Sequence, residues 1–201
     1  MNKLVIFDLD GVLFESRDMH FETLNRALMK EGLAPISRVA HEVKFNGLPT
    51  RVKLEMLHVT DEQEVRIRHE KQMLTMGWLR ENVRINKKLI SLLQWLRARG
   101  YKIAVCTNAV SATLREALDR LWLRNLVDWS VSGDSQFPPK PAPDMYFRCM
   151  GVLNSDPANT IIVEDSEVGV EGAKKTGAEV IIVGGPADVP SAVMQAIGVE
   201  P

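Results

Sequence analysis

Short runs of apolar residues alternate with segments of helical periodicity over most of the chain. Five such runs, each of four or five residues, are typical of strands buried on both faces of a parallel sheet. They lie at residues 3–7, 102–106, 129–132, 160–163 and 180–183. Between most of them apolar residues recur at helical spacing, for example in residues 89–96. This alternation predicts an α/β fold with a doubly wound, Rossmann-like, five-stranded parallel sheet.

Residues 17–85 interrupt this alternation with helical patterns alone. Apolar positions within residues 21–28 share one face of a predicted helix, which Gly32 ends. Residues 60–63 have the sequence of a capping box ahead of a long helix, in which the charged run 66–71 is interpreted as the solvated face. The simplest interpretation is an all-helical domain, here called the helical insert, placed after the first strand. The core domain would comprise residues 1–16 and 86–201, and the helical insert residues 17–85.

Composition and charge exclude several classes of protein. The chain has 201 residues, of which 45% are hydrophobic and 25% charged, the balance of a globular protein. Its 25 basic and 26 acidic residues give a net charge of −1 without a basic tail, which argues against a nucleic-acid-binding protein. The apolar runs are too short to cross a bilayer, and the first residues form no signal-peptide core, so no membrane partner is expected. Cys106 and Cys149 lack the spacing of a zinc site or a disulfide framework, and a cytoplasmic monomer is the default expectation.

The first predicted strand ends in two carboxylates, Asp8 and Asp10, followed by Gly11. Residues two apart in an extended chain point to the same side, so both carboxylates can face the crevice where open α/β sheets bind ligands. Carboxylates this close repel each other unless a cation or a shared proton lies between them. A bound Mg²⁺ fits, because it prefers oxygen ligands and combines carboxylates with phosphate. The alternative is that the pair only forms a turn or caps a helix.

A second acidic pair, Glu164 and Asp165, follows the fourth predicted strand. By the same crevice rule it should lie beside the first pair, and the two pairs together make a candidate divalent-metal site. Asp165 or Ser166 could also cap the helix that follows, which would not prevent metal binding.

Three further polar residues suit the oxygens of a phosphoryl group. Thr107 and Asn108 follow the second predicted strand and offer a hydroxyl, an amide and a backbone N–H near the start of a helix. Lys140 lies in the proline-rich segment 138–143, whose stiff backbone would hold the ammonium in place. Taken singly, a Thr-Asn pair is ordinary turn chemistry and a loop lysine is ordinarily solvated.

Together these four blocks resemble the motifs of the haloacid dehalogenase superfamily of aspartate-nucleophile phosphotransferases. The blocks are residues 7–13 (FDLDGVL), Thr107 with Asn108, Lys140 in the segment KPAPD, and residues 163–166 (VEDS) with Gly169. They occur in the family's order and at the matching places in the strand pattern. The resemblance covers nearly the whole chain, because the helical insert is similar to the small helical cap of the family's β-phosphoglucomutase-like branch. That branch has a five-stranded parallel core.

The resemblance implies a function and a set of roles. Asp8 would attack phosphorus to form an aspartyl-phosphate, and Asp10 would act as the general acid and then the general base. The implied magnesium ligands are Asp8, the backbone carbonyl of Asp10, and Asp165, with Glu164 close by. The implied phosphate-binding groups are Thr107, Asn108 and Lys140. The expected activity is that of a Mg²⁺-dependent phosphatase, a phosphoric monoester hydrolase, on a small phosphorylated metabolite such as a sugar phosphate.

Two residues of the helical insert are candidates for substrate contacts. His20 lies one helical turn after Ser16, and the β-phosphoglucomutase group resembles this chain in having a histidine there. Arg51 follows a segment that is similar to a loop meeting the distal end of the substrate. In the mutase group an arginine stands where this chain has Thr50, and this shift favours hydrolysis. Either candidate could instead be an ordinary surface residue.

Two alternatives to a phosphatase remain open. A phosphosugar mutase of the β-phosphoglucomutase type would share every core residue and would keep the aspartyl-phosphate from water until a second transfer. A non-catalytic binding protein on the same fold is less favoured, because Asp8, Asp10, Lys140 and Asp165 are all present.

Overall fold

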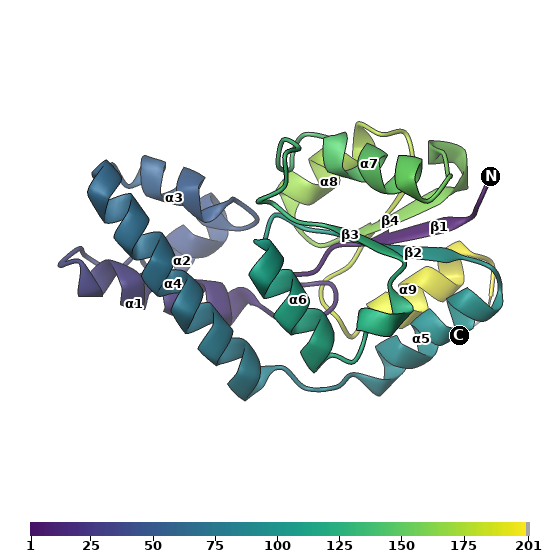
Figure 1. Ribbon diagram of the computed structural model, residues 1–201, viewed down its shortest axis with the longest axis horizontal. Coiled ribbons are helices and arrows are strands. Elements are labelled where there is room, and N and C mark those ends of the chain that lie inside the picture. Colours follow the sequence, from purple (N-terminus) through teal and green to yellow (C-terminus); the bar gives the residue numbers. More distant parts are fainter. Residues whose placement is uncertain (200–201) are drawn as a thin grey trace.

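A five-stranded parallel sheet forms the centre of the protein (Figure 1). The computed structural model describes residues 1–199, so the last two residues of the predicted core domain lie outside the described residues. The strand order is β3-β2-β1-β4-β5. The strands are β1 (Leu4–Phe7), β2 (Lys102–Cys106), β3 (Trp129–Val131), β4 (Thr160–Glu164) and β5 (Glu179–Ile182). The predicted fold class is confirmed, and each predicted strand ends within one residue of the observed bounds.

The first strand of the chain occupies the middle of the sheet. β1 pairs with β2 on one side and with β4 on the other, which places Phe7 opposite both Val105 and Val163. All four residues of β1 are fully buried, because both faces of the sheet are covered. Phe7 and Val5 belong to one apolar cluster and the other two residues to a second cluster on the opposite face. The strand order reverses between β1 and β4, and ligands of open α/β sheets bind beside such a reversal.

Helices cover both faces of this sheet (Figure 1). One face packs against α7 (Asp144–Val152) and α8 (Glu167–Lys174). The other face packs against α5 (Lys87–Ala98), α6 (Ser111–Arg120) and α9 (Val189–Ala196). Two short 3₁₀ helices, η2 (Arg124–Leu126) and η3 (Pro157–Asn159), lead into β3 and β4. The sheet is therefore doubly wound, and a ligand site can form at the carboxyl ends of its strands.

The segment between β1 and α5 is helical. It contains α1 (Arg17–Lys30), α2 (Arg38–Ala40), the π-helix η1 (His41–Phe45), α3 (Thr50–Met56) and α4 (Asp61–Asn82). Helices α1 and α4 pack together, and a separate apolar cluster lies between the helices: Leu24, Ala27, Leu28, Leu54 and Ile67. The capping box starts α4 as predicted, because Thr60 Oγ1 accepts the N–H of Gln63 while Gln63 Oε1 accepts the N–H of Thr60.

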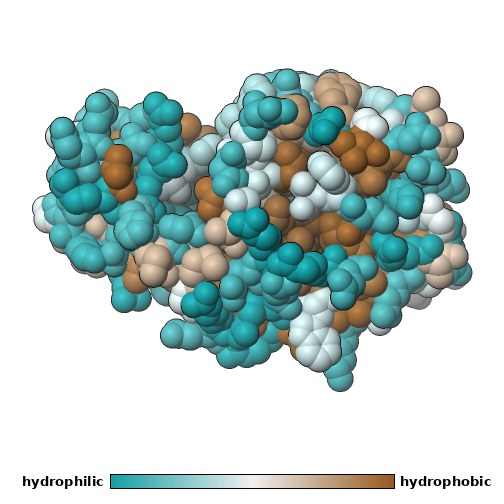
Figure 2. All heavy atoms as spheres, in the orientation of Figure 1, coloured by the Kyte–Doolittle hydropathy of each residue, from teal (hydrophilic) through white to brown (hydrophobic). Residues whose placement is uncertain are grey.

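The helical insert stands beyond the carboxyl ends of the strands, on the left in Figure 1. Figure 2 shows that hydrophilic side chains dominate its surface on the face drawn, although several large apolar residues of the insert are exposed: Met29, Val39, Val43, Met56, Val65 and Met73. No helix within residues 1–199 has the length and apolar character needed to cross a membrane. We retain as a proposal the division into a core domain (1–16 and 86–201) and the helical insert (17–85).

Candidate active site

The polar residues that follow β1, β2 and β4 line one cavity between the strand ends and the helical insert. Asp8 and Asp10 follow β1, Thr107 and Asn108 follow β2, and Asp165 follows β4. The cavity has a volume of about 760 Å³. It lies outside the β1–β4 boundary, the place where the strand order reverses and where ligands of such sheets bind. The structure thus brings together residues that are far apart in the sequence.

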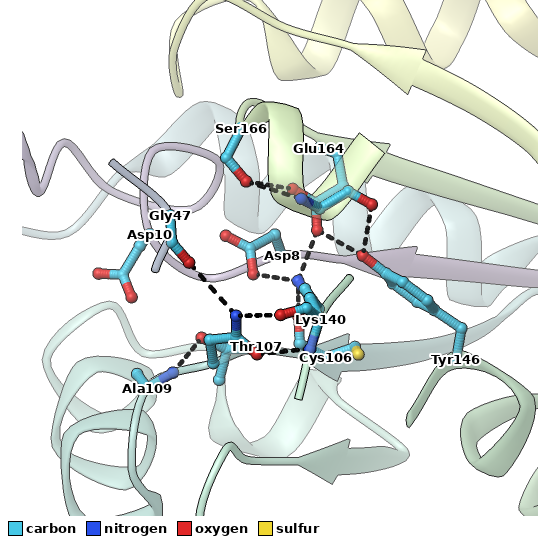
Figure 3. A network of polar contacts seen from close by, with 12 residues as sticks. Asp8, Asp10, Gly47, Cys106, Thr107, Ala109, Lys140, Tyr146, Glu164 and Ser166 are labelled. Carbon is cyan, nitrogen blue, oxygen red and sulfur yellow. Dashed lines mark hydrogen bonds and ion pairs between the residues drawn. The ribbon is translucent and has the colours of Figure 1, made fainter. Parts of the chain in front are cut away.

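Lys140 is a buried, fully engaged cation at the bottom of this site (Figure 3). Its Nζ donates to Asp8 Oδ1 at 2.6 Å, to Glu164 Oε1 at 2.5 Å and to the carbonyl oxygen of Cys106 at 2.6 Å. These contacts use all three N–H groups of the ammonium. Burial alone would lower the pKa of Lys140, but the Asp8 and Glu164 carboxylates raise it well above its ordinary value. Asp8 therefore faces a fixed positive charge.

Glu164 is fully buried and accepts a hydrogen bond from the Lys140 ammonium. Tyr146 of α7 donates a 2.6 Å hydrogen bond to Glu164 Oε1, the same oxygen that faces Lys140. Gly169 lies so close that a Cβ at this position would overlap the Glu164 carboxylate. Ser166 caps α8 by accepting the N–H of Gly169, as the sequence allowed. Tyr146 was missed in the sequence, because a tyrosine on an amphipathic helix has the pattern of any core aromatic residue.

Three carboxylates form a cluster suited to a cation. Oxygen atoms of Asp8, Glu164 and Asp165 all lie within 4.8 Å of one another. Burial, together with the Glu164 and Asp10 carboxylates, raises the pKa of Asp165 to about 7. Burial also raises the pKa of Asp8, and the opposing effect of Lys140 does not cancel it. A divalent cation would hold these crowded groups in their ionised form, and an all-oxygen donor set suits Mg²⁺. The residues present therefore fit magnesium.

Asp10 points toward the helical insert and away from the acidic cluster. Its Oδ1 lies 3.0 Å from Nε2 of His20 on α1. Burial would raise the pKa of Asp10, but His20 and Lys71 lower it below its ordinary value. Burial lowers the pKa of His20, and Asp10 partly offsets this. His20 thus lines the cavity next to the second aspartate rather than standing on the outer surface.

The side chain of Asn108 connects the loop that carries Lys140 with the helical insert. Its Oδ1 accepts the backbone N–H of Lys140 at 2.9 Å, and its Nδ2 donates to the carbonyls of Lys140 and Gly47 at 3.2 and 3.3 Å. Thr107 is buried in the cavity wall, and its Oγ1 accepts the N–H of Ala109 at 3.0 Å. The side chain of Asn108 is therefore engaged with backbone groups, and the hydrogen of the Thr107 hydroxyl is left for another acceptor.

Arg51 lies at the rim of the cavity. Its side chain is 69% exposed, and its Nε lies 3.0 Å from Oε1 of Glu55, one turn further along α3. The structure does not bring Arg51 to the acidic cluster, and a contact between Arg51 and substrate stays a prediction.

Two lysines that the sequence interpretation missed line the cavity from the helical insert. Lys53 on α3 and Lys71 on α4 are both buried. The interpretation of residues 66–71 as a solvated face is wrong for Lys71 and for Ile67. A signal was present in the sequence, since every fourth residue from Ile67 to Leu79 lies on one buried stripe with an apolar residue at each end.

A carboxylate that faces a cavity, beside a fixed ammonium and a cluster of acidic groups that fits a cation, is suited to phosphoryl transfer. The comparison with known families agrees with this class. The family model described as haloacid dehalogenase-like hydrolase matches residues 5–183. The chain belongs to this family, which confirms the resemblance drawn from the four sequence motifs.

Named relatives include phosphatases. Phosphorylated carbohydrates phosphatase from Thermotoga maritima is 32% identical over 182 residues, which cover 87% of this chain and 82% of that protein. Phosphoglycolate phosphatase from Pseudomonas putida is 27% identical over 186 residues, covering 89% of this chain and 68% of that protein. The solved structure of β-phosphoglucomutase from Clostridium difficile has a TM-score of 0.80 at 22% identity, covering 96% of this chain and 89% of that one. This last likeness shows the fold.

Proposed function

We propose that the protein is a Mg²⁺-dependent phosphatase that hydrolyses a small phosphorylated metabolite, such as a sugar phosphate or a similar monoester. The observation that carries the proposal is Asp8, a carboxylate in the cavity wall that Lys140 holds at 2.6 Å. The phosphatase names of two relatives support hydrolysis as the reaction.

In the first half of the reaction, a carboxylate oxygen of Asp8 attacks phosphorus while the bond from phosphorus to the ester oxygen breaks. The product on the enzyme is an aspartyl-phosphate. Asp10 gives a proton to the departing oxygen, so the alcohol leaves neutral. The negative charge of the substrate would raise the pKa of Asp10 from its lowered value, because a like charge disfavours the carboxylate. Asp10 then carries the proton that this step needs.

In the second half, a water molecule attacks the phosphorus of the aspartyl-phosphate and passes its proton to Asp10. The bond from phosphorus to the Asp8 oxygen breaks, which releases inorganic phosphate and restores the Asp8 carboxylate. His20, 3.0 Å from Asp10, holds the carboxyl group at the insert side of the cavity through both steps.

Fixed charges and donors would stabilise the phosphoryl oxygens. Lys140 contributes its charge, since its three N–H groups are already engaged, and Thr107 and the backbone N–H of Asn108 act as donors. We assign the magnesium ligands to Asp8, the backbone carbonyl of Asp10, and Asp165, with Glu164 beside them. When bound, Mg²⁺ supplies positive charge that offsets the nucleophile and the phosphoryl oxygens together.

Release of inorganic phosphate from a panel of phosphorylated metabolites with Mg²⁺ tests this proposal. Asp8→Asn keeps the shape of the side chain and removes the nucleophile, so turnover should fall by at least about 10³-fold. Asp18→Asn is the matched control, because Asp18 is an exposed carboxylate on α1 whose partner is Arg38. Substantial turnover by Asp8→Asn would refute the mechanism. A folded wild-type protein that releases no phosphate from any ester would favour a mutase that needs a bisphosphate activator, or a binding protein.

The phosphosugar mutase remains the alternative reaction. It would need a bisphosphate activator and would return little inorganic phosphate. Arg51 is exposed and paired with Glu55, and this supports hydrolysis, because the arginine is not held in place for a second phosphate group. Efficient phosphate release without any bisphosphate would exclude the mutase.

We further propose that the enzyme works as a cytoplasmic monomer. Both cysteines, Cys106 and Cys149, are free and buried, which agrees with a reducing compartment. Elution at 22.5 kDa in size-exclusion chromatography with light scattering would support the monomer, and elution at twice that mass would contradict it.

A further inference from the structure

Two buried ammonium groups face the cavity from the helical insert. Lys53 of α3 is 4% exposed and Lys71 of α4 is 7% exposed, and both line the cavity wall. Within residues 1–199 neither Nζ has a hydrogen-bond or ion-pair partner. Burying a charge is unfavourable unless a group of opposite charge or a set of hydrogen bonds compensates it. In the part of the chain that the structure describes, these two charges therefore have no partner in contact, and the Asp10 carboxylate offsets them only in part.

Two arginines of the helical insert that line this cavity behave differently. Arg51 lies 3.0 Å from Glu55, and Arg68 lies 3.2 Å from Glu64. Both arginines are at least half exposed, so water and a carboxylate satisfy them. Unlike these two arginines, Lys53 and Lys71 contact no carboxylate within the described residues, so their charges are available to a ligand.

The surroundings of the pair are electropositive. Burial, and then the charge of Lys71, lowers the pKa of Lys53 to about 7, and burial lowers the pKa of Lys71 to about 8. His41 of η1 belongs to the same group, since burial and the charge of Lys53 lower its pKa to about 4. Asp10 is the acidic group that acts on both lysines, and it already contacts His20.

The charged residues therefore give the cavity a negative end and a positive wall. Asp8 and Asp165 make one end negative, where the cation and the phosphoryl group belong, and the lysines make the opposite wall positive. Thr75, one turn after Lys71 on α4, adds a buried Oγ1 with no hydrogen-bond partner within the described residues. A sugar hydroxyl could accept a hydrogen bond from one lysine, but it would leave two ammonium charges unneutralised. An anionic group would neutralise them.

We propose that Lys53 and Lys71 bind a second anionic group, a carboxylate or a phosphate, on the alcohol part of the phosphomonoester. The inference rests on the proposed phosphatase function and narrows its substrate class to esters with a charged leaving group. The lysines are specificity residues, because their attraction to the remote group places the phosphorus against Asp8. Sugar phosphates whose alcohol part is uncharged would lack this contact and react more slowly.

Two matched substrate pairs test the proposal through Asp8-dependent phosphate release with Mg²⁺. The first pair is 2-phosphoglycolate and 2-hydroxyethyl phosphate, and the second is propane-1,3-diol bisphosphate and 3-hydroxypropyl phosphate. We expect the wild type to prefer the charged member of at least one pair. Lys53→Met and Lys71→Met should each lower kcat/KM for that member by about 10- to 100-fold, mainly through KM. Rates on the uncharged member, which also report on folding, should fall at least about tenfold less than rates on the charged member, because any effect of the lysines on Asp10 is common to both esters.

Lys44→Met is the control, because Lys44 is an exposed lysine of the same insert and lies outside the cavity wall. It should leave all four rates unchanged. A preference confined to one pair supports the proposal and identifies the group as carboxylate or phosphate. Equal losses on charged and uncharged members, or a wild type without preference in either pair, would overturn it. Absence of Asp8-dependent release from all four esters would instead overturn the phosphatase function itself.

Discussion

Replacing Lys53 by methionine removes a buried charge and keeps nearly the same side-chain length and volume. Lys53 is 4% exposed, and burial together with Lys71 lowers its pKa from 10.5 to about 7. In the unfolded chain the same ammonium is hydrated and keeps its ordinary pKa. Burial of this lysine therefore lowers the free energy of unfolding at every pH at which the lysine is protonated in the unfolded chain. We expect Lys53→Met to be more stable than the wild type at neutral pH while losing the proposed substrate preference.

The size of the gain follows from the pKa. A fall from 10.5 to about 7, at about 1.36 kcal/mol for each pH unit, corresponds to about 5 kcal/mol at pH well below 7. Between pH 7 and 10.5 the unfolded chain binds one more proton at this position than the folded chain, so wild-type stability rises with pH. The advantage of Lys53→Met should therefore shrink from about 4 kcal/mol at pH 7 to about 2 kcal/mol at pH 9.

Urea unfolding of both proteins at pH 7 and pH 9, followed by circular dichroism, measures this difference. Lys44→Met serves as the control, since Lys44 is exposed and its replacement should change the unfolding free energy little at either pH. The reasoning fails if Lys53→Met is less stable than the wild type at pH 7. It also fails if the stability difference is the same at both pH values.

Three other predictions concern the core of the site. Asp10→Asn should slow turnover by at least about 100-fold, most strongly for esters with poor leaving groups, and equal slowing of alkyl and nitrophenyl esters would rule out proton donation. Tyr146→Phe removes the donor to Glu164 and should lower the unfolding free energy in urea by about 1–2 kcal/mol; an unchanged midpoint would show that the hydrogen bond adds no stability. Exchange of Mg²⁺ for Ca²⁺ should inhibit phosphate release, because Ca²⁺ takes more ligands at longer distances, and equal rates would argue against a tight site.

The strand ends could be predicted because a strand buried on both faces is a continuous apolar run, and the first polar residue after it marks the edge of the sheet. This reasoning located Asp8, Thr107 and Glu164. Lys140 could be placed in a stiff loop from its prolines, but its link to the other residues came from the family's motifs. Its contacts with Asp8 and Glu164 depend on tertiary packing that no local pattern encodes.

The wall formed by the helical insert could not be predicted in the same way. A lysine on a helix is exposed in most proteins, so Lys71 was interpreted as solvated and no local pattern marked Lys53 as buried. Their burial depends on how α3 and α4 pack over the strand ends. Tyr146 presents the same difficulty, because its hydroxyl finds its acceptor 18 positions along the chain, on β4.

The central position of β1 has a consequence for synthesis of the chain. Asp8 leaves the ribosome early, but its lysine lies 132 positions later. β1 can pair with β2 only after residues 102–106 exist, and with β4 only after residues 160–164 exist. Until then the most apolar strand of the protein has no complete set of neighbours, and a partly made sheet with open edges is prone to aggregation. Translation of the second half of the chain thus both completes the site and covers this strand.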